Sequence, residues 1–271
     1  MKGVDISHYQ NGLTIQQIRD SGGEFAIIKL TEGSYLVDAA AFGFYREAYE
    51  TGFPMGCYCY SHAVNAPQAR AEAAFLLDNL HGFPMPCGIY LDVEENDQLA
   101  LSSRDLKNVI LGWCETIRAA GYIPGVYGSE GNLWAKVSPN ELPDGTLIWV
   151  ARWSNSAPNT PCDLWQTSDN GRIDGYDGPV DTDITRGNRI TALAETAAQD
   201  YDRHRKRLQS ANVQPVEAPS AEARPSPSEK AVIPILQLLM SYFGYWGEVD
   251  GQKSPEFFTA ARTFLDDLER G

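Results

Sequence analysis

Residues 88–94 read Gly88-Ile89-Tyr90-Leu91-Asp92-Val93-Glu94, a short apolar run that ends in two carboxylates. Strands that are covered on both faces show such continuous apolar runs in place of a polar alternation. We therefore expect a buried strand that ends near Asp92. Asp92 and Glu94 are two residues apart, so in extended backbone their side chains point the same way, with Cα atoms about 6.5–7 Å apart.

Similar apolar runs recur through residues 1–188, and most of them alternate with amphipathic stretches. The predicted strands are residues 3–6, 25–30, 54–60, 88–92, 123–127, 148–151 and 163–166. The predicted helices are residues 14–20, 39–51, 67–80 and 103–120. This alternation predicts parallel strands joined by crossover helices. We expect an α/β fold, an irregular (β/α) barrel of about five β/α units plus short final strands, with its chemistry at the strand C-terminal ends. An open doubly wound sheet is the alternative.

The composition changes twice after residue 188. Residues 189–208 are polar and alanine-rich, which predicts helix, and residues 209–230 hold four Pro, four Ala, four Ser and three Glu. The second composition is typical of a linker. Residues 231–271 return to helical periodicity but are fewer than usually fold alone. We predict a barrel domain at 1–188, a helical and Pro/Ala/Ser-rich linker at 189–230, and a small α-helical module at 231–271.

The net charge of −14 lies mostly on residues 1–188, which carry 12 Lys and Arg against 24 Asp and Glu. Binding to phosphate relies on Lys and Arg, so this acidity argues against a nucleic acid partner. It suits a neutral sugar polymer or a cationic ligand, or else it serves solubility alone. No run of about 18 apolar residues occurs, so no membrane insertion is expected. The first residues lack the apolar core of a signal peptide, which predicts synthesis in the cytoplasm.

The cysteines and histidines show no metal-binding pattern. The number of cysteines is odd and no pair has C-x-x-C spacing, so we expect reduced, mostly buried thiols. They are Cys57, Cys59, Cys87, Cys114 and Cys162. The four histidines form no ligand pair at helical or zinc-finger spacing, so we expect no metal and no cofactor.

The carboxylate pair of Asp92 and Glu94 suits the hydrolysis of a glycosidic bond. One protonated carboxyl can protonate the leaving oxygen, while an ionised one stabilises positive charge at the anomeric carbon. Two carboxylates at such a short distance repel each other, which raises the pKa of at least one of them. This favours a proton shared by the pair near neutral pH. Acid pairs are also common on solvated loops, so the pair alone is a weak signal.

Further acids at other strand ends strengthen this interpretation. Asp5 ends the first predicted strand and Asp181 lies in a last short strand at 179–183, and each follows a valine in an apolar context. An unpaired acid would be costly there. The alternatives are an N-cap or turn for Asp5 and an Asx-turn for Asp181 and Asp183. Acids at three strand ends together favour one active-site cleft.

Several segments of the chain resemble the glycoside hydrolase family 25 lysozymes, the muramidases found in many phage endolysins. The first is Gly3-Val4-Asp5-Ile6-Ser7-His8-Tyr9-Gln10, and others are residues 25–33, 58–63, 90–94, 164–166 and 180–181. They occur in the order of the family and span about residues 1–187. The resemblance implies a β/α barrel with fewer helices than an eightfold one. It also implies cleavage of the β-1,4 bond from N-acetylmuramic acid to N-acetylglucosamine in bacterial peptidoglycan.

The resemblance also implies roles for individual acids. Glu94 would be the general acid and base. Asp92 would orient and charge-stabilise the 2-acetamido group of the substrate, or attack directly. Asp5 and Asp181 would line the same cleft. Asp183 stands where the family often has a small polar residue such as Asn, so it is a second candidate for substrate binding beside Asp181.

Other site expectations concern aromatic and edge residues. Four aromatic residues are candidates for stacking on sugars, with core packing as the alternative for each: Tyr60, Tyr127, Trp149 and Trp165. Lys29 and Glu32 are expected to pair, structurally or at the cleft edge. The family commonly has a His where this chain has Ser61, and His62 is one position further on. We therefore leave His62 outside the predicted site.

Residues 232–264, which include Gly244-Tyr245-Trp246, resemble a small helical peptidoglycan-binding module. Ser254 stands where such modules usually have Gly, and Leu265 where Gln follows the aromatic residue. The expected function is an endolysin-type muramidase that acts on the wall after release from a host cytoplasm. The alternative is a catalytically inactive carbohydrate-binding barrel whose residues 231–271 form a dimerising hairpin. An amidase or peptidase of the wall would need a zinc or Cys/His constellation, and the sequence shows none.

Overall fold

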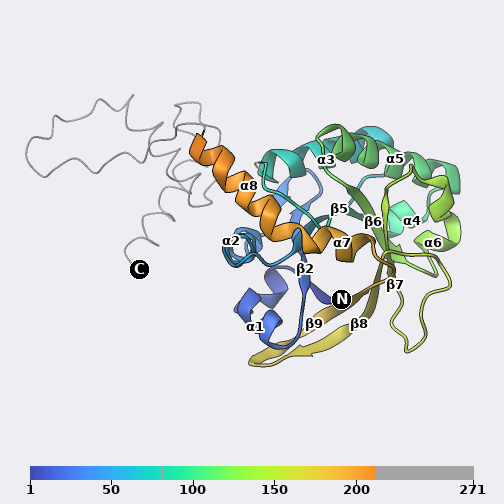
Figure 1. Ribbon diagram of the computed structural model, residues 1–271. Coiled ribbons are helices and arrows are strands. Elements are labelled where there is room, and N and C mark those ends of the chain that lie inside the picture. The colour runs from blue at the N-terminus through green and yellow to red at the C-terminus, as the bar shows by residue number, and fades with distance from the viewer. Residues whose placement is uncertain (81, 211–271) are drawn as a thin grey trace, which may run out of the picture. The chain divides into compact units, whose positions relative to one another are not determined.

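One sheet closes into a barrel because its first strand, β1 (Lys2–Ile6), pairs with both β9 and β2 (Phe25–Glu32). The computed structural model describes residues 1–80 and 82–210 (Figure 1). Around the ring the order is β1, β9, β8, β7, β6, β5, β4 and β2. The further strands of the ring are β4 (Met55–Tyr60), β5 (Ile89–Asp92), β6 (Pro124–Ser129), β7 (Leu147–Ala151), β8 (Leu164–Ile173) and β9 (Tyr176–Thr185). The short β3 (Leu36–Val37) pairs only with β2, outside the ring.

The barrel is parallel except at its last two strands. All neighbouring pairs from β1 through β2, β4, β5, β6 and β7 to β8 are parallel, while β9 is antiparallel to both β8 and β1. The predicted irregular (β/α) barrel is therefore confirmed, and closure of the ring excludes the open doubly wound sheet. The final strands differ from expectation, because β8 and β9 have ten residues each. Only Asp174 and Gly175 lie between them, too few for the crossover that parallel strands need.

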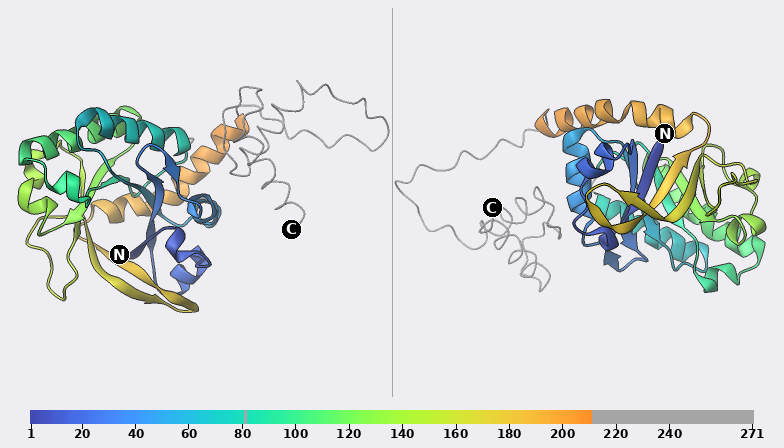
Figure 2. Two further views of the ribbon diagram at one scale, coloured as in Figure 1. Left: turned by 180° about the vertical axis from the view of Figure 1, so that it is seen from behind. Right: turned by 90° about the horizontal axis from the view of Figure 1, so that it is seen from below.

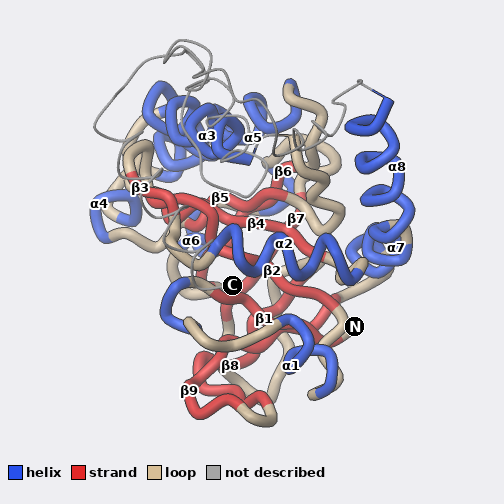
Figure 3. The backbone as a smooth tube through the Cα atoms, turned by 90° about the vertical axis from the view of Figure 1, so that its left-hand side faces the viewer, coloured by secondary structure: helices blue, strands red, loops and turns tan. Residues whose placement is uncertain are grey.

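Helices pack against the outer side of the parallel strands (Figures 2 and 3). The longer ones are α1 (Ile15–Asp20), α2 (Ala41–Thr51), α3 (Ala66–Leu80) and α5 (Ser103–Ala119). Shorter turns of helix are α4 (Asn96–Leu99), α6 (Leu133–Lys136), η1 (His8–Gln10) and η2 (Pro139–Glu141). Thr14 caps α1 by accepting from the Gln17 amide, and Ser102 caps α5 by accepting from the Asp105 amide. These caps satisfy amides that would otherwise lack partners, so both helices begin where the sequence indicates.

Aromatic side chains fill the inside of the barrel below the strand ends. A cluster containing Phe25, Tyr90, Tyr127 and Trp149 is separate from the larger core between sheet and helices. A Cβ added to Gly125 would lie 2.2 Å from the Tyr90 ring, so glycine at this register position makes room for that ring. Interior positions of a small barrel are filled by side chains. The barrel therefore has a packed floor and is not a pore.

Two helices follow the barrel strands and pack on the same body. They are α7 (Arg189–Glu195) and α8 (Ala197–Ser210), which confirms the predicted helical character of residues 189–208. Tyr201 of α8 is fully buried, and its hydroxyl donates to the Phe53 carbonyl at 3.1 Å and accepts from the Met55 amide at 3.2 Å. This helical part of the predicted linker is thus anchored to the barrel. The boundaries at residues 188 and 230 stay predictions, and the remaining linker and the 231–271 module lie outside the described residues.

Three further observations concern the described part of the chain. All five cysteines carry free thiols and four of them are buried, as predicted. Within residues 1–80 and 82–210, no helix combines the length and apolar character needed to cross a membrane. In the same ranges no three or more His, Cys, Asp or Glu side chains are grouped so that they could hold a metal ion.

Candidate active site

Strand register brings the predicted acids to one end of the barrel. Asp5 of β1 lies opposite Asp181 of β9, and Asp92 is the last residue of β5. Glu94 follows two residues later. Burial is the main cause that raises the pKa of the Tyr127 hydroxyl, and the charges of all four carboxyls raise it further. Tyr127 is therefore close to each of these acids. The four acids that were predicted from three strand ends therefore face one common site.

Asp92 is a buried acid, and one of its carboxylate oxygens lacks a hydrogen-bond partner among the described residues. Its side chain is 5% exposed, and its Oδ1 has no hydrogen-bond partner among the described residues. Burial raises the pKa of Asp92 well above its ordinary value, the charge of Glu94 raises it further, and Lys29 opposes both. A buried polar atom without a partner is costly, so a substrate N–H group that reached Oδ1 would relieve that cost.

Glu94 lies beyond the end of β5, where the chain leaves the regular strand. Unlike Asp92, its side chain is open to solvent on one side, so it can reach a bound polymer. The rest of its surroundings removes water from the carboxyl, and this partial burial is the first cause of a raised pKa. The charges of Glu95 and Asp181 raise the pKa further, while Lys29 lowers it. Glu94 is thus a reachable carboxyl that holds its proton to a higher pH than usual.

Gln166, at the end of the parallel part of β8, connects the acids to aromatic residues. Its Nε2 donates to Asp5 Oδ2 at 2.9 Å and to Asp181 Oδ2 at 3.4 Å. Its Oε1 accepts from the Tyr127 hydroxyl at 2.9 Å and from Trp153 Nε1 at 3.0 Å. Sequence reasoning noted Gln166 only within a resembling segment and gave it no role, because its partners depend on strand register.

Asp181 and Asp183, the two candidates of β9, occupy different environments. Asp183 is 1% exposed, and its Oδ1 accepts from Trp149 Nε1 at 2.8 Å. Burial raises its pKa to about 7. Asp181 is partly exposed, and burial raises its pKa to about 6. Its partial exposure therefore favours Asp181 as the residue that a substrate could reach, whereas Asp183 is buried inside the barrel.

The four aromatic residues predicted for sugar stacking differ in their exposure. Tyr60 is partly exposed, and its hydroxyl donates to Glu95 Oε1 at 2.9 Å. Tyr127, Trp149 and Trp165 are buried, and Trp149 packs its ring 4.5 Å from that of Tyr127. Burial of the ring faces corresponds to core packing, the alternative given above for each residue.

Other aromatic rings are exposed around the acids, and sequence reasoning missed them. Trp153 follows β7 directly, is 60% exposed, and donates to Gln166. Tyr35 follows β2, is 67% exposed, and stacks on His62 with ring centroids 6.0 Å apart. Both lie in loops after the C-terminal ends of parallel strands, where a barrel places its functional groups. That position was the available signal.

A charged network lies beside the acids on β2 and β4. The predicted pair is present, because Lys29 Nζ lies 2.7 Å from Glu32 Oε2. His62, which was left outside the predicted site, lies 3.3 Å from Glu32 through Nε2 and 3.5 Å from Glu95 through Nδ1. Glu95 was not singled out from the sequence either.

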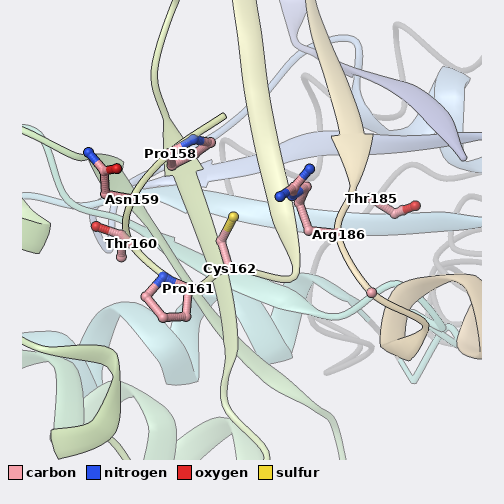
Figure 4. A pocket seen from close by; sticks show the side chains of 8 residues that line it. Pro158, Asn159, Thr160, Pro161, Cys162, Thr185 and Arg186 are labelled. Carbon is pink, nitrogen blue, oxygen red and sulfur yellow. The ribbon is translucent and has the colours of Figure 1, made fainter. Parts of the chain in front are cut away.

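One hollow of the described surface lies away from these acids. It has a volume of about 470 Å³ and is formed by residues before β8 and after β9 (Figure 4). Its lining residues are Pro158, Asn159, Thr160, Pro161, Cys162, Thr185, Arg186 and Gly187. It contains no carboxylate and touches none of the predicted site residues, so we place the chemistry at the acid cluster.

The burial of Asp183 predicts a pH-dependent gain in stability on substitution by Asn. An acid whose pKa rises on folding, here from 3.8 to about 7, contributes stability that is full below pH 4 and is lost as the pH rises through 7. Asparagine still accepts from Trp149 but never ionises. We expect the free energy of unfolding of Asp183→Asn to exceed that of wild type by about 1–3 kcal/mol at pH 8 and to equal it near pH 4.

Urea unfolding at both pH values measures this difference. Asp177→Asn, on an exposed position of the same strand, is the matched control and should leave stability unchanged at both. A gain of equal size at pH 4 and pH 8, or a loss at pH 8, would contradict the interpretation.

The part of the chain that matches a known protein family includes three of the four acids. The model of the family "Glycosyl hydrolases family 25" matches residues 4–176, which include Asp5, Asp92 and Glu94 and end before Asp181. Lysozyme M1 of Streptomyces globisporus is 30% identical over 216 residues, covering 73% of this chain and 72% of that protein.

Solved structures show the same fold. A bacterial lysozyme from Streptomyces coelicolor aligns with a TM-score of 0.62 and 26% identity, over 74% of this chain and 98% of that one. The CTP1L endolysin aligns with a TM-score of 0.63 over 72% of this chain and 69% of its own, at 19% identity. At that identity the second likeness concerns the fold alone.

Proposed function

The chain belongs to the glycosyl hydrolases of family 25, and from this premise we propose that it is an endolysin-type muramidase. It would hydrolyse the β-1,4 bond between N-acetylmuramic acid and N-acetylglucosamine in bacterial peptidoglycan. The observation that carries the proposal is the pairing of a solvent-accessible Glu94, whose pKa is raised, with the buried Asp92. Such a pair supplies a proton donor and a stabilising carboxyl on either side of one glycosidic bond.

Glu94 is proposed as the general acid and base. Its raised pKa keeps a proton on the carboxyl closer to neutrality, and its exposure lets that proton reach the glycosidic oxygen of a bound chain. As the bond from C1 to this oxygen breaks, the proton moves from Glu94 to the leaving sugar. The resulting carboxylate then removes a proton from the water that completes hydrolysis.

Asp92 is proposed to hold the 2-acetamido group of the sugar whose C1 reacts. Its unpartnered Oδ1 can accept the amide N–H, which directs the acetamido oxygen toward C1. That oxygen forms a bond to C1 as the leaving oxygen departs, and water later opens the ring that results. The positive charge of this intermediate, together with that of Lys29, opposes the burial that raises the pKa of Asp92, so that an ionised Asp92 stabilises the intermediate. Direct attack by Asp92 is the alternative.

The remaining groups would bind and orient the sugar. Asp181 faces the cleft, while Gln166 ties it to Asp5 and to the indole of Trp153. The exposed ring of Trp153 offers an apolar face to a sugar, and its N–H is already used by Gln166, which fixes the plane of the ring. Tyr60 is the predicted stacking residue that keeps an accessible position.

Participation of the acetamido group predicts retention of configuration, because C1 is attacked twice from opposite directions. Proton NMR of a digest of soluble peptidoglycan chains, recorded within the first minutes, should show the β-anomer of the new reducing end before mutarotation. First appearance of the α-anomer would replace this mechanism by direct inversion, in which Asp92 or a neighbouring acid activates water. The muramidase assignment itself would stand in either case.

Parts of the proposal concern residues beyond the described range. Residues 231–271 are proposed to bind the cell wall, or as an alternative to join two copies of the chain. The partner would be peptidoglycan, with no nucleic acid and no membrane insertion. The protein would be made in a host cytoplasm and act on the wall after release. The resemblance of residues 232–264 to a wall-binding module supports the targeting role.

A further inference from the structure

Glu95, directly after the proposed acid Glu94, is fixed by two side chains of the neighbouring β4 segment. The Tyr60 hydroxyl donates to Glu95 Oε1 at 2.9 Å, and His62 Nδ1 lies 3.5 Å from the same oxygen. Burial and the Glu95 carboxyl raise the pKa of Tyr60, so the hydroxyl keeps its proton and stays a donor. Glu95 is also the N-cap residue of α4, so its backbone is held at the start of a helix.

His62 links Glu95 to a second carboxylate on β2. Its Nε2 lies 3.3 Å from Glu32 Oε1, and Glu32 Oε2 accepts from Lys29 Nζ at 2.7 Å. This hydrogen bond from Lys29 is the main reason that the pKa of Glu32 lies below its ordinary value. Lys29 Nζ also lies 5.0 Å from the centre of the Tyr60 ring. The five side chains therefore form a closed ring of contacts around the edge of the site.

The contacts of His62 define what its two protonation states can do. A neutral imidazole has one N–H donor, whereas the imidazolium has two. Both ring nitrogens of His62 face carboxylates, so only the imidazolium donates to Glu32 and Glu95 together. The other groups that face the residue are Tyr60, the ring of Tyr35, and Glu72 of α3, which accepts from the His62 amide at 2.9 Å.

We propose that His62 is a positioning residue of the reaction, which together with Tyr60 holds the Glu95 carboxylate beside the general acid Glu94. The inference rests on the function proposed for Glu94. After partial burial, the charge of Glu95 is the largest influence that raises the pKa of Glu94. A positive His62 compensates that charge and a neutral His62 does not. His62 thus sets, through Glu95, how far up the pH scale Glu94 keeps its proton.

Opposite displacements of the pH profile distinguish this role from a structural one. The alkaline limb of kcat/KM on soluble peptidoglycan chains reports the acid of the free enzyme. Glu95→Gln removes a negative charge and should move the limb to lower pH. His62→Phe keeps a ring for Tyr35 but removes the ring nitrogens that face Glu32 and Glu95, and should move the limb to higher pH. Each displacement should be about half a pH unit, because partly exposed charges are screened by solvent and salt.

The double variant tests whether His62 acts through Glu95. When Glu95→Gln is already present, His62→Phe should cause no further displacement, as expected for two coupled residues. If His62→Phe folds poorly, His62→Gln can replace it in the test. Its side chain is neutral and polar, and it should displace the limb in the same direction. His204→Phe, on α8 and remote from the acids, is the matched control and should leave the limb in place.

Three outcomes would overturn the inference. In the first, the alkaline limb does not move in either His62 variant. In the second, Glu95→Gln and His62→Phe displace the limb in the same direction. In the third, the effect of the His62 substitution persists when Glu95→Gln is already present. Failure of the proposed function is separable, because it would appear as full activity of Glu94→Gln whatever the His62 variants do.

Discussion

Glu94→Gln is expected to lower kcat on purified peptidoglycan by about 10³-fold, since a general acid typically contributes 10²–10⁴-fold. Glutamine has nearly the same size as glutamate but has no proton to give to the leaving oxygen. The side chain is solvent-accessible and has few packing contacts to lose, so the melting temperature should stay within a few degrees of wild type. Release of reducing ends under saturating substrate measures kcat.

A matched control is Glu115→Gln on the exposed face of α5, where the carboxylate pairs with Arg70. It removes one acid from the same domain and should keep full activity. Reducing ends released by Glu94→Gln at more than about a tenth of the wild-type rate would exclude Glu94 as the proton donor.

Asp92→Asn is expected to lower kcat by about 10²–10³-fold, through loss of the charge that stabilises the intermediate. The amide can still fill the space of the carboxyl. Because the buried carboxyl of Asp92 has a raised pKa, ionisation destabilises the fold at pH 8, and the variant should unfold at the same or a higher temperature than wild type. Loss of activity without loss of stability is the diagnostic combination.

Asp78→Asn, on an exposed position of α3, is the control for Asp92→Asn and should change neither property. A fully active Asp92→Asn variant would remove Asp92 from the mechanism. A variant that is inactive because its melting temperature has collapsed would show a structural role in place of the proposed chemical one.

The barrel was predictable because its strands follow a simple rule. Continuous apolar runs that alternate with capped amphipathic helices predict parallel strands, and residues 25–28 of β2 and 89–91 of β5 fit this pattern. The hairpin of β8 and β9 was less visible, since residues 167–172 and 174–179 are polar and largely exposed. Its strands are stabilised by mutual pairing and by contacts to α1, such as Gln17 Nε2 to the Gly175 carbonyl at 2.7 Å.

The acids of the site were predictable from a similar pattern. An acid at the end of an apolar strand costs folding free energy, so its presence there indicates a function. Gln166, Glu95 and His62 gave no such signal. Their importance comes from which side chains lie opposite them in neighbouring strands and loops, and that depends on register and rotamers. The burial of Trp149 and Trp165 likewise follows from the closed interior of the barrel, which composition alone does not reveal.

The identity of the new reducing end tests the central claim most directly. Purified peptidoglycan is digested with the 271-residue protein, the products are reduced with borohydride, and the reduced amino sugars are identified by mass spectrometry. The muramidase account predicts reduced muramic acid as the new terminus, and its loss in Glu94→Gln. Reduced glucosamine, free peptide amines, or no new termini from the wild-type protein would contradict the account, the last outcome pointing to an inactive carbohydrate-binding barrel.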